Sequence, residues 1–230
     1  EEVPAIQKMI IKKTVAAGKQ VITATQMLDS MMKNPRATRA EISDVANAIY
    51  DGTSAIMLSG ETAKGDYPLE AIQTMAKIAM TAEAEAMRGE QHALMAANYG
   101  ISMTNAMSHA ACSAAKELKA ACIISITKSG YTARSISKFK PSCPIVGCTY
   151  NERVQRQLNL VWGCKPVLIE GKPGDSTDDV FARAVAKVEA LEIAQQGDAI
   201  VLSAGVPMGL EGSSNIMRVQ YVGKVLTKGM

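Results

Sequence analysis

The sequence has 230 residues, of which 47% are apolar, 20% charged and 4% aromatic, and its formal net charge is +3. This composition supplies enough apolar material for one or two packed cores and lacks the polar bias of a disordered chain. Because the charges are dispersed and aromatic residues are few, we expect no nucleic-acid surface. No apolar run approaches the roughly 18 residues of a membrane-spanning helix, so we expect no membrane partner.

The start of the chain and its cysteines favour a cytoplasmic protein. Glu1-Glu2-Val3-Pro4 lacks the basic-then-apolar pattern of a secretory signal, and a start at Glu1 instead of Met indicates processing or a fragment. The five cysteines are odd in number and show no CxxC spacing, which predicts reduced core thiols. The two histidines are too isolated to predict a histidine-based metal site.

The first part of the chain, residues 1–86, is predicted to alternate helix and short strand. Apolar spacing predicts a helix over residues 5–17, and the apolar run 21–24 predicts a buried strand. The capping box at 38–41 predicts the start of a second helix, and a second buried strand is expected at 55–58. This order of elements indicates parallel pairing of the two strands.

A third helix is predicted to begin at Pro68, after the loop 59–65. Helical spacing also predicts which faces of the first and third helices are buried. We expect burial of Ile6, Met9, Ile10 and Val15 on the first helix and of Leu69, Ile72, Met75, Ala76, Ala79 and Met80 on the third. Methionines on such faces are expected to fill the core and not to bind a cofactor.

Residues 87–100 lose apolar periodicity and contain glycine, which predicts a linker between domains at 1–86 and 101–230. In the second domain helices alternate with continuously apolar runs, a pattern typical of a parallel sheet covered on both faces. The last segment, 217–221, alternates apolar and polar side chains, which predicts an edge strand that can run antiparallel. The expected fold class is therefore α/β, with a mostly parallel sheet flanked by helices.

Polar side chains follow both predicted strands of the first domain. Thr25 comes directly after the first strand, and Ser59 and Glu61 follow the second. In parallel α/β folds, ligands and catalytic groups gather at the C-terminal ends of the strands. Hydroxyl side chains at such positions are also common turn formers and helix caps, so spacing alone leaves both interpretations open.

A second polar cluster follows the apolar run 122–126. It combines hydroxyls, a flexible glycine and an ammonium group before a predicted helix, in Thr127, Lys128, Ser129, Gly130, Tyr131 and Thr132. Backbone amides and the positive end of a helix dipole at such a place suit a phosphate group, although an ordinary helix cap explains part of the pattern. The loop 205–215 follows another strand end and could close over the same pocket.

Four strings of the first domain resemble pyruvate kinase, in the same order and register. They are ATQMLDSM at 24–31, PRATRAE at 35–41, SDVANA at 43–48 and MLSGETAKGDYP at 57–68. The resemblance continues through the second domain at 127–130, 156–158, 162–163 and 205–209. It covers essentially the whole chain, but only the C-terminal half of the family's sequence.

The resemblance implies a partial (β/α)₈ or TIM barrel followed by a smaller α/β regulatory domain. Residues 1–86 would then be the last two strand–helix units of the barrel, which two strands alone cannot close. Family members are glycolytic enzymes that transfer a phosphoryl group from phosphoenolpyruvate to ADP, giving pyruvate and ATP. The family also implies a homotetramer.

The resemblance further implies that Thr25 contacts the three-carbon substrate and helps deliver a proton to the enolate. A water relay fed by Ser59 and Glu61 would carry this proton, and Lys64 would either meet the nucleotide or stay solvated. The family uses Mg²⁺ or Mn²⁺, with K⁺ as a further cation. Its metal-binding carboxylates and catalytic lysine lie upstream of Glu1, so we assign no metal ligand here and expect the isolated chain to be inactive.

For the second domain the resemblance implies an allosteric site. There the cluster 127–132 and the loop with Pro207 and Gly209 would bind a regulatory phosphosugar or a nucleotide monophosphate such as AMP. Glu211 would repel a second phosphate, so we expect a monophosphate effector. The alternative hypothesis is a freestanding, non-catalytic module that binds phosphorylated small molecules through this domain.

Overall fold

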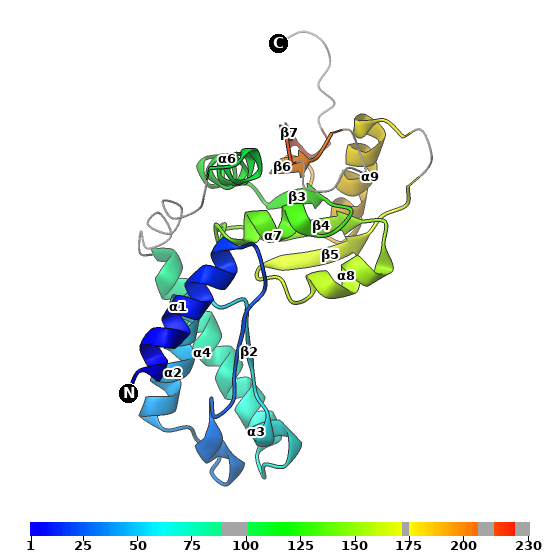
Figure 1. The fold of residues 1–230 in the computed structure, drawn as a ribbon. Coiled ribbons are helices and arrows are strands. Elements are labelled where there is room, and N and C mark those ends of the chain that lie inside the picture. Colours follow the sequence, from blue (N-terminus) through cyan, green and yellow to red (C-terminus); the bar gives the residue numbers. More distant parts are fainter. Residues whose placement is uncertain (89–100, 172–174, 207–213, 224–230) are drawn as a thin grey trace. The chain divides into compact units, whose positions relative to one another are not determined.

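The computed structural model describes residues 1–88, 101–171, 175–206 and 214–223 (Figure 1). The chain divides into two compact units, Glu1–Ala97 and Asn98–Met230. Most of the predicted linker, residues 89–100, lies outside the described residues. Among the helices that the structure describes, none combines the length and apolarity that a bilayer crossing requires.

The first unit follows the predicted order of elements. It comprises α1 (Val3–Ala16), β1 (Ile22–Ala24), η1 (Asp29–Met32), α2 (Arg39–Tyr50), β2 (Ala55–Met57), α3 (Gly60–Ala63) and α4 (Pro68–Arg88). β1 and β2 pair in parallel, with Ile22 opposite Ala55 and Ala24 opposite Met57. The capping box of α2 is confirmed, whereas the short helices η1 and α3 fall in segments where the sequence predicted no helix.

The predicted buried faces of α1 and α4 were largely wrong. α1 buries Ile11 and Val15, while Ile6, Met9 and Ile10 are exposed. α4 buries Ala71, Met75 and Ala82, whereas Leu69, Ile72, Ala76 and Met80 are exposed and Ala79 is half-buried. Both helices carry apolar residues around much of their circumference, and the two strands of this unit cover only part of it.

The core of the first unit lies beside the loop that follows β1. Met27, Leu28 and Met31 from this loop pack with residues of α2 and α4, which contribute Val45, Ala48, Ala71 and Met75. These side chains are nearly inaccessible to solvent, so the chain must turn inward directly after β1. Apolar burial therefore holds the loop that follows Thr25 against two helices.

The second unit is an α/β layer structure with a five-stranded sheet. It comprises α6 (Met103–Glu117), β3 (Cys122–Ile126), α7 (Tyr131–Ser137), β4 (Ile145–Thr149), α8 (Glu152–Leu158), β5 (Cys164–Leu168), α9 (Thr177–Ala190), β6 (Ala199–Ala204) and β7 (Ile216–Tyr221). The strand order is β5-β4-β3-β6-β7, and only β7 runs antiparallel to its neighbour. Both the mostly parallel sheet and the antiparallel edge strand confirm the sequence prediction.

Helices cover both faces of this sheet (Figure 1). On one face α9 packs over a core that includes Ile124 and Leu202, and on the other α6, α7 and α8 pack over a core that includes Ile123 and Val201. All five cysteines are free, as predicted. Burial raises the pKa of the Cys148 thiol to about 12, so this side chain behaves as an uncharged apolar residue.

Candidate active site and effector site

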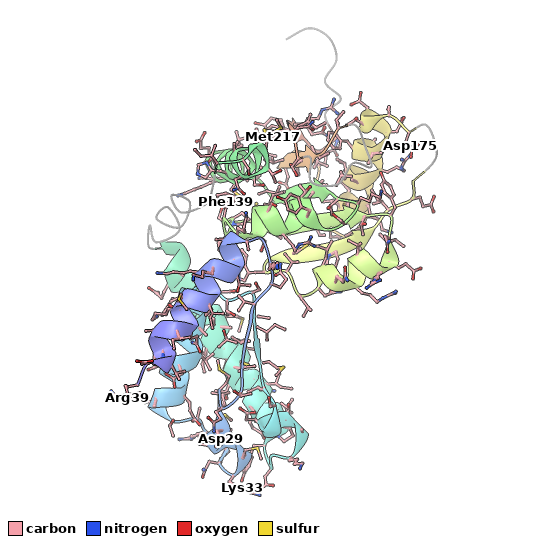
Figure 2. The ribbon with its side chains drawn as sticks, viewed as in Figure 1. Asp29, Lys33, Arg39, Phe139, Asp175 and Met217 are labelled. Atoms are coloured by element: carbon pink, nitrogen blue, oxygen red, sulfur yellow. The ribbon has the colours of Figure 1, made fainter. Side chains whose placement is uncertain are left out.

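Two loops meet at the C-terminal end of β1 and β2, and we call residues 25–34 and 59–66 the loop pair. The Asp66 amide donates to the Met32 carbonyl at 2.9 Å, and the Lys33 ammonium lies 3.2 Å from the Asp66 carboxylate. Asp29 and Lys33 mark this end of the unit in Figure 2. The parallel strands thus bring together the predicted residues Thr25, Ser59 and Glu61 at one edge.

Thr25 and its neighbour Gln26 both adopt a left-handed backbone conformation, with φ of 71° and 53°. This conformation is costly for a β-branched residue such as threonine, on the order of 1–3 kcal/mol. Both residues are exposed at the end of β1, so burial of their own side chains does not explain the strain. An exposed hydroxyl held in a strained turn at a strand end is typical of a functional position.

The buried carboxylate of Glu61 joins the two loops. Its side chain is only 2% exposed, its Oε1 accepts from the Leu28 amide at 3.1 Å, and its Oε2 accepts from the Ser59 amide at 2.8 Å. Burial by itself raises the pKa of Glu61, but the surrounding backbone amides outweigh it and lower the pKa below its ordinary value. The carboxylate is therefore ionised and fastens both loops; its place in a proton relay stays a prediction.

A second carboxylate supports the same region. Glu41 Oε1 accepts from the Ser30 amide at 2.7 Å, and Glu41 Oε2 accepts from the Ser30 hydroxyl at 2.6 Å and the Thr38 amide at 2.8 Å. Burial opposes ionisation, yet these hydrogen bonds lower the pKa of Glu41 overall. The sequence shows the capping box with Thr38 but not the contact with Ser30, because nothing in the spacing shows that this loop folds back onto α2.

The other predicted residues of the first unit have simpler environments. Ser59 is half-buried at the start of α3, and its carbonyl accepts from the Thr62 hydroxyl at 3.3 Å. Lys64 is exposed at the end of α3. A role of Lys64 toward nucleotide stays a prediction.

The residues that the structure describes do not fit a metal site. Among them no group of three or more His, Cys, Asp or Glu side chains could hold a metal ion. The oxygens of the buried Glu61 accept from backbone amides, and those of Glu41 accept from Ser30 and Thr38. Carboxylates engaged in this way hold the protein's own loops instead of presenting open coordination positions.

The second polar cluster forms the connection between β3 and α7. Thr127, Gly130 and Thr132 are buried, Ser129 and Tyr131 are half-buried, and Lys128 is exposed. Gly130 has φ of +80°, and the Arg134 guanidinium donates to the Ser129 carbonyl at 3.0 Å. The connection is thus a fixed turn that leaves Lys128 at the surface and Ser129 partly accessible.

The Thr132 hydroxyl points inward and not toward solvent. It lies 2.7 Å from the Ser214 hydroxyl, and both side chains are buried. This contact ties the start of α7 to the segment that leads into β7. The contact of Ser214, in the loop 205–215, could not be predicted, since a contact between residues so far apart in the chain leaves no local signal in the sequence.

Asn215 holds together the two ends of the loop after β6. Its side-chain oxygen accepts from the Val206 amide at 2.8 Å, and its side-chain nitrogen donates to the Val206 carbonyl at 2.6 Å. Pro207 and Gly209, which we predicted to bind an effector, lie outside the described residues. Their place relative to the 127–132 turn stays a prediction.

Comparison with known protein families assigns both units. The family model of the pyruvate kinase barrel domain matches residues 1–72, and that of the pyruvate kinase alpha/beta domain matches residues 105–220. The chain belongs to the pyruvate kinase family. This confirms the resemblance carried by the sequence strings and agrees with the α/β fold of both units.

Individual pyruvate kinases are similar along nearly the whole chain. The chain is 50% identical to that of Clostridium acetobutylicum over 222 residues, which is 96% of this chain and 46% of the relative. It is 45% identical to that of Sporosarcina psychrophila over 237 residues and 48% identical to that of Bacillus licheniformis over 229 residues, in each case over 100% of this chain and 39% of the relative. The chain therefore spans less than half the length of these relatives.

The hydrogen bonds of Glu61 predict a pH-dependent stability of the loop pair. Because the folded-state pKa lies below the ordinary value of 4.5, this contribution is present above that value and is lost as the pH falls through the folded-state pKa. Glu61→Gln replaces one acceptor oxygen by an NH₂ group that faces a backbone amide. We therefore expect the free energy that opposes local opening of the loop pair to fall by about 1–3 kcal/mol. Hydrogen exchange at the Leu28 and Ser59 amides measures this loss.

The matched control is Asp44→Asn, which makes the same chemical change at an exposed position in the middle of α2. This variant should leave the exchange of both amides unchanged. If the Leu28 amide is equally protected in Glu61→Gln and in the wild-type chain at neutral pH, the fastening role of Glu61 is wrong.

Proposed function

We propose that this chain forms the C-terminal part of a pyruvate kinase. The complete enzyme would transfer the phosphoryl group of phosphoenolpyruvate to ADP and then protonate the enolate, giving pyruvate and ATP in glycolysis. The observation that carries the proposal is the loop pair, in which the strained Thr25 lies at a strand end and Glu61 fastens its loop to the neighbouring one. Family membership supports the reaction class.

In this proposal Thr25 contacts the three-carbon substrate. A threonine hydroxyl is too weak an acid to protonate an enolate unaided, so the proton would pass from solvent through water and the hydroxyls of Thr25 and Ser59. Glu61 is ionised and buried, and in this proposal it fixes the positions of the two loops that carry the Thr25 and Ser59 hydroxyls. Lys64, exposed at the end of α3, would meet the nucleotide or remain solvated.

The phosphoryl-transfer step needs charge neutralisation that the described residues do not offer. Mg²⁺ or Mn²⁺, with K⁺ as a further cation, would stabilise charge on the transferred phosphate when bound. We assign these ions to side chains outside the described residues, because the carboxylates of the loop pair bind amides and hydroxyls of their own chain. The family also favours a cytoplasmic homotetramer as the working form.

The first functional prediction is that the isolated chain does not turn over. With phosphoenolpyruvate, ADP and Mg²⁺, a coupled assay should give no pyruvate formation above background. A hybrid in which this chain follows the N-terminal part of the Clostridium acetobutylicum pyruvate kinase should be active, since half of the matched residues are identical. Robust turnover by the isolated chain would mean that it carries its own charge-neutralising groups.

A second prediction tests Thr25 within that hybrid. Thr25→Gly removes the hydroxyl and relieves the left-handed backbone, and we expect kcat to fall by about 10²-fold or more. Gln26→Gly relieves the same kind of strain one residue later but keeps the Thr25 hydroxyl, so it should retain most of the activity. Equal losses in both variants would show that backbone conformation, and not the hydroxyl, is what matters.

We also propose that the turn 127–132 binds a phosphorylated effector. Lys128 is exposed and Ser129 is half-buried, so both side chains can reach a ligand, and the left-handed conformation of Gly130 sets the turn between them and α7. By family resemblance, Pro207 and Gly209 would contribute to the same effector site. Because Glu211 would repel a second phosphate, we favour a monophosphate such as AMP or a sugar monophosphate.

Effector binding can be followed by the fluorescence of Trp162, the one tryptophan of the chain. Its ring lies 4.3 Å from the Lys140 ammonium, and its carbonyl accepts from the Ser137 hydroxyl at the end of α7. Titration with AMP or a sugar monophosphate should give a saturable change. Lys128→Ala should weaken binding about tenfold by removing a charge-assisted hydrogen bond, whereas Lys187→Ala, exposed on α9, should have no effect.

The titration also separates the two functional hypotheses. Effector binding together with an active hybrid supports a regulated pyruvate kinase. Effector binding together with an inactive, folded hybrid favours the alternative, a non-catalytic module that binds phosphorylated small molecules. No response to any phosphorylated ligand would remove the effector proposal and leave the family assignment intact.

A further inference from the structure

Four buried serines of the second unit share an unusual property. The hydroxyls of Ser108, Ser125, Ser135 and Ser203 have no hydrogen-bond partner among the described residues, and each side chain is 0–1% exposed. A buried hydroxyl without a partner costs free energy, and most such groups in proteins are satisfied. Four of them on neighbouring elements therefore call for an explanation.

The sheet brings two of these serines side by side. Ser125 on β3 and Ser203 on β6 are register partners on adjacent parallel strands. Side chains alternate along a strand, so both lie on the same face as Ile123 and Val201, two residues earlier. That face carries the core formed with α6 and α7.

The two helices over this face carry the other serines. α6 is joined to β3 by a short turn, and its buried positions, Thr104, Ser108, Ala111 and Ala115, have the spacing of one helix face. α7 returns along β3 after the turn 127–132, and Ser135 lies one turn inside its start. α6 and α7 contact each other and both contact β3, so Ser108 and Ser135 are buried in the helix layer that covers the face of Ser125 and Ser203; we call these four residues the serine layer.

The chemistry of the serine layer points to water. Each hydroxyl offers one donor and can accept twice, so it can pair with a bound water molecule, and the four side chains themselves are uncharged. The helix serines also do not donate to carbonyls of the preceding turn, their usual local partners. A water molecule needs two to four polar partners, which hydroxyls from two strands and two helices can supply.

We propose that the serine layer is an internal hydration site that holds at least one water molecule between the sheet and the α6–α7 pair. The water bridges Ser125 and Ser203 to Ser108 and Ser135. Ser135 lies about one helical turn after Thr132 on α7, so this water extends the buried polar contacts that begin with the Thr132–Ser214 pair. The proposal does not depend on effector binding or on catalysis.

Alanine substitution tests the proposal, because a bound water and a dry layer predict opposite changes in the unfolding midpoint. If water is bound, Ser125→Ala/Ser203→Ala removes two of its partners and should lower the unfolding midpoint of the second unit, followed by Trp162 fluorescence, by about 2–4 °C. If no water is bound and the hydroxyls are unpaired, the same variant removes the free-energy cost of burying two unsatisfied hydroxyls and should raise the unfolding midpoint. A raised or unchanged midpoint overturns the proposal.

Ser137→Ala is the matched control. The buried Ser137 hydroxyl donates to the Trp162 carbonyl at 2.8 Å, so its removal should lower the unfolding midpoint whether or not water is bound in the serine layer. A crystal structure at high resolution gives a direct readout even if the double variant does not fold. We expect a water oxygen within about 2.7–3.2 Å of at least two of the four hydroxyls. Protein partners for all four hydroxyls, or a dry layer, would overturn the proposal.

Discussion

A single buried carboxylate organises the first unit. Glu61 receives one backbone amide from each of the two loops that follow β1 and β2, and it does so where water cannot compete. An ionised group in this position is stable only while both amides point at it, so the conformation of one loop is tied to that of the other. The strained backbone at Thr25 can persist because the residues just after it are anchored by Glu61 and by the apolar core.

The two units differ in how much of their apolar surface is buried within the chain. The second unit covers a five-stranded sheet on both faces and so has two apolar cores. The first unit has two short strands, and much of the apolar surface of α1 and α4 remains exposed. Within the first unit, the buried contacts of Glu61 and Glu41 fix the loops that carry its candidate functional residues.

Sequence predicted the elements well and the side-chain contacts less well. The capping box of α2 and the alternating pattern of β7 are local signals, and both are confirmed. The buried face of α1 was misjudged because a wide apolar stripe does not show which part meets the sheet. The family strings pointed to Thr25 and Glu61, but neither the left-handed backbone of Thr25 nor the amide partners of Glu61 can be read from spacing. Both follow from how distant segments pack.

The paired hydrogen bonds between Asn215 and Val206 have a consequence for how this protein can change over time. They close the loop after β6 at its base and fix the spacing between the end of β6 and the start of β7. A change at Asn215 would loosen the end of β6 and the start of β7 together, so this position is expected to tolerate few substitutions.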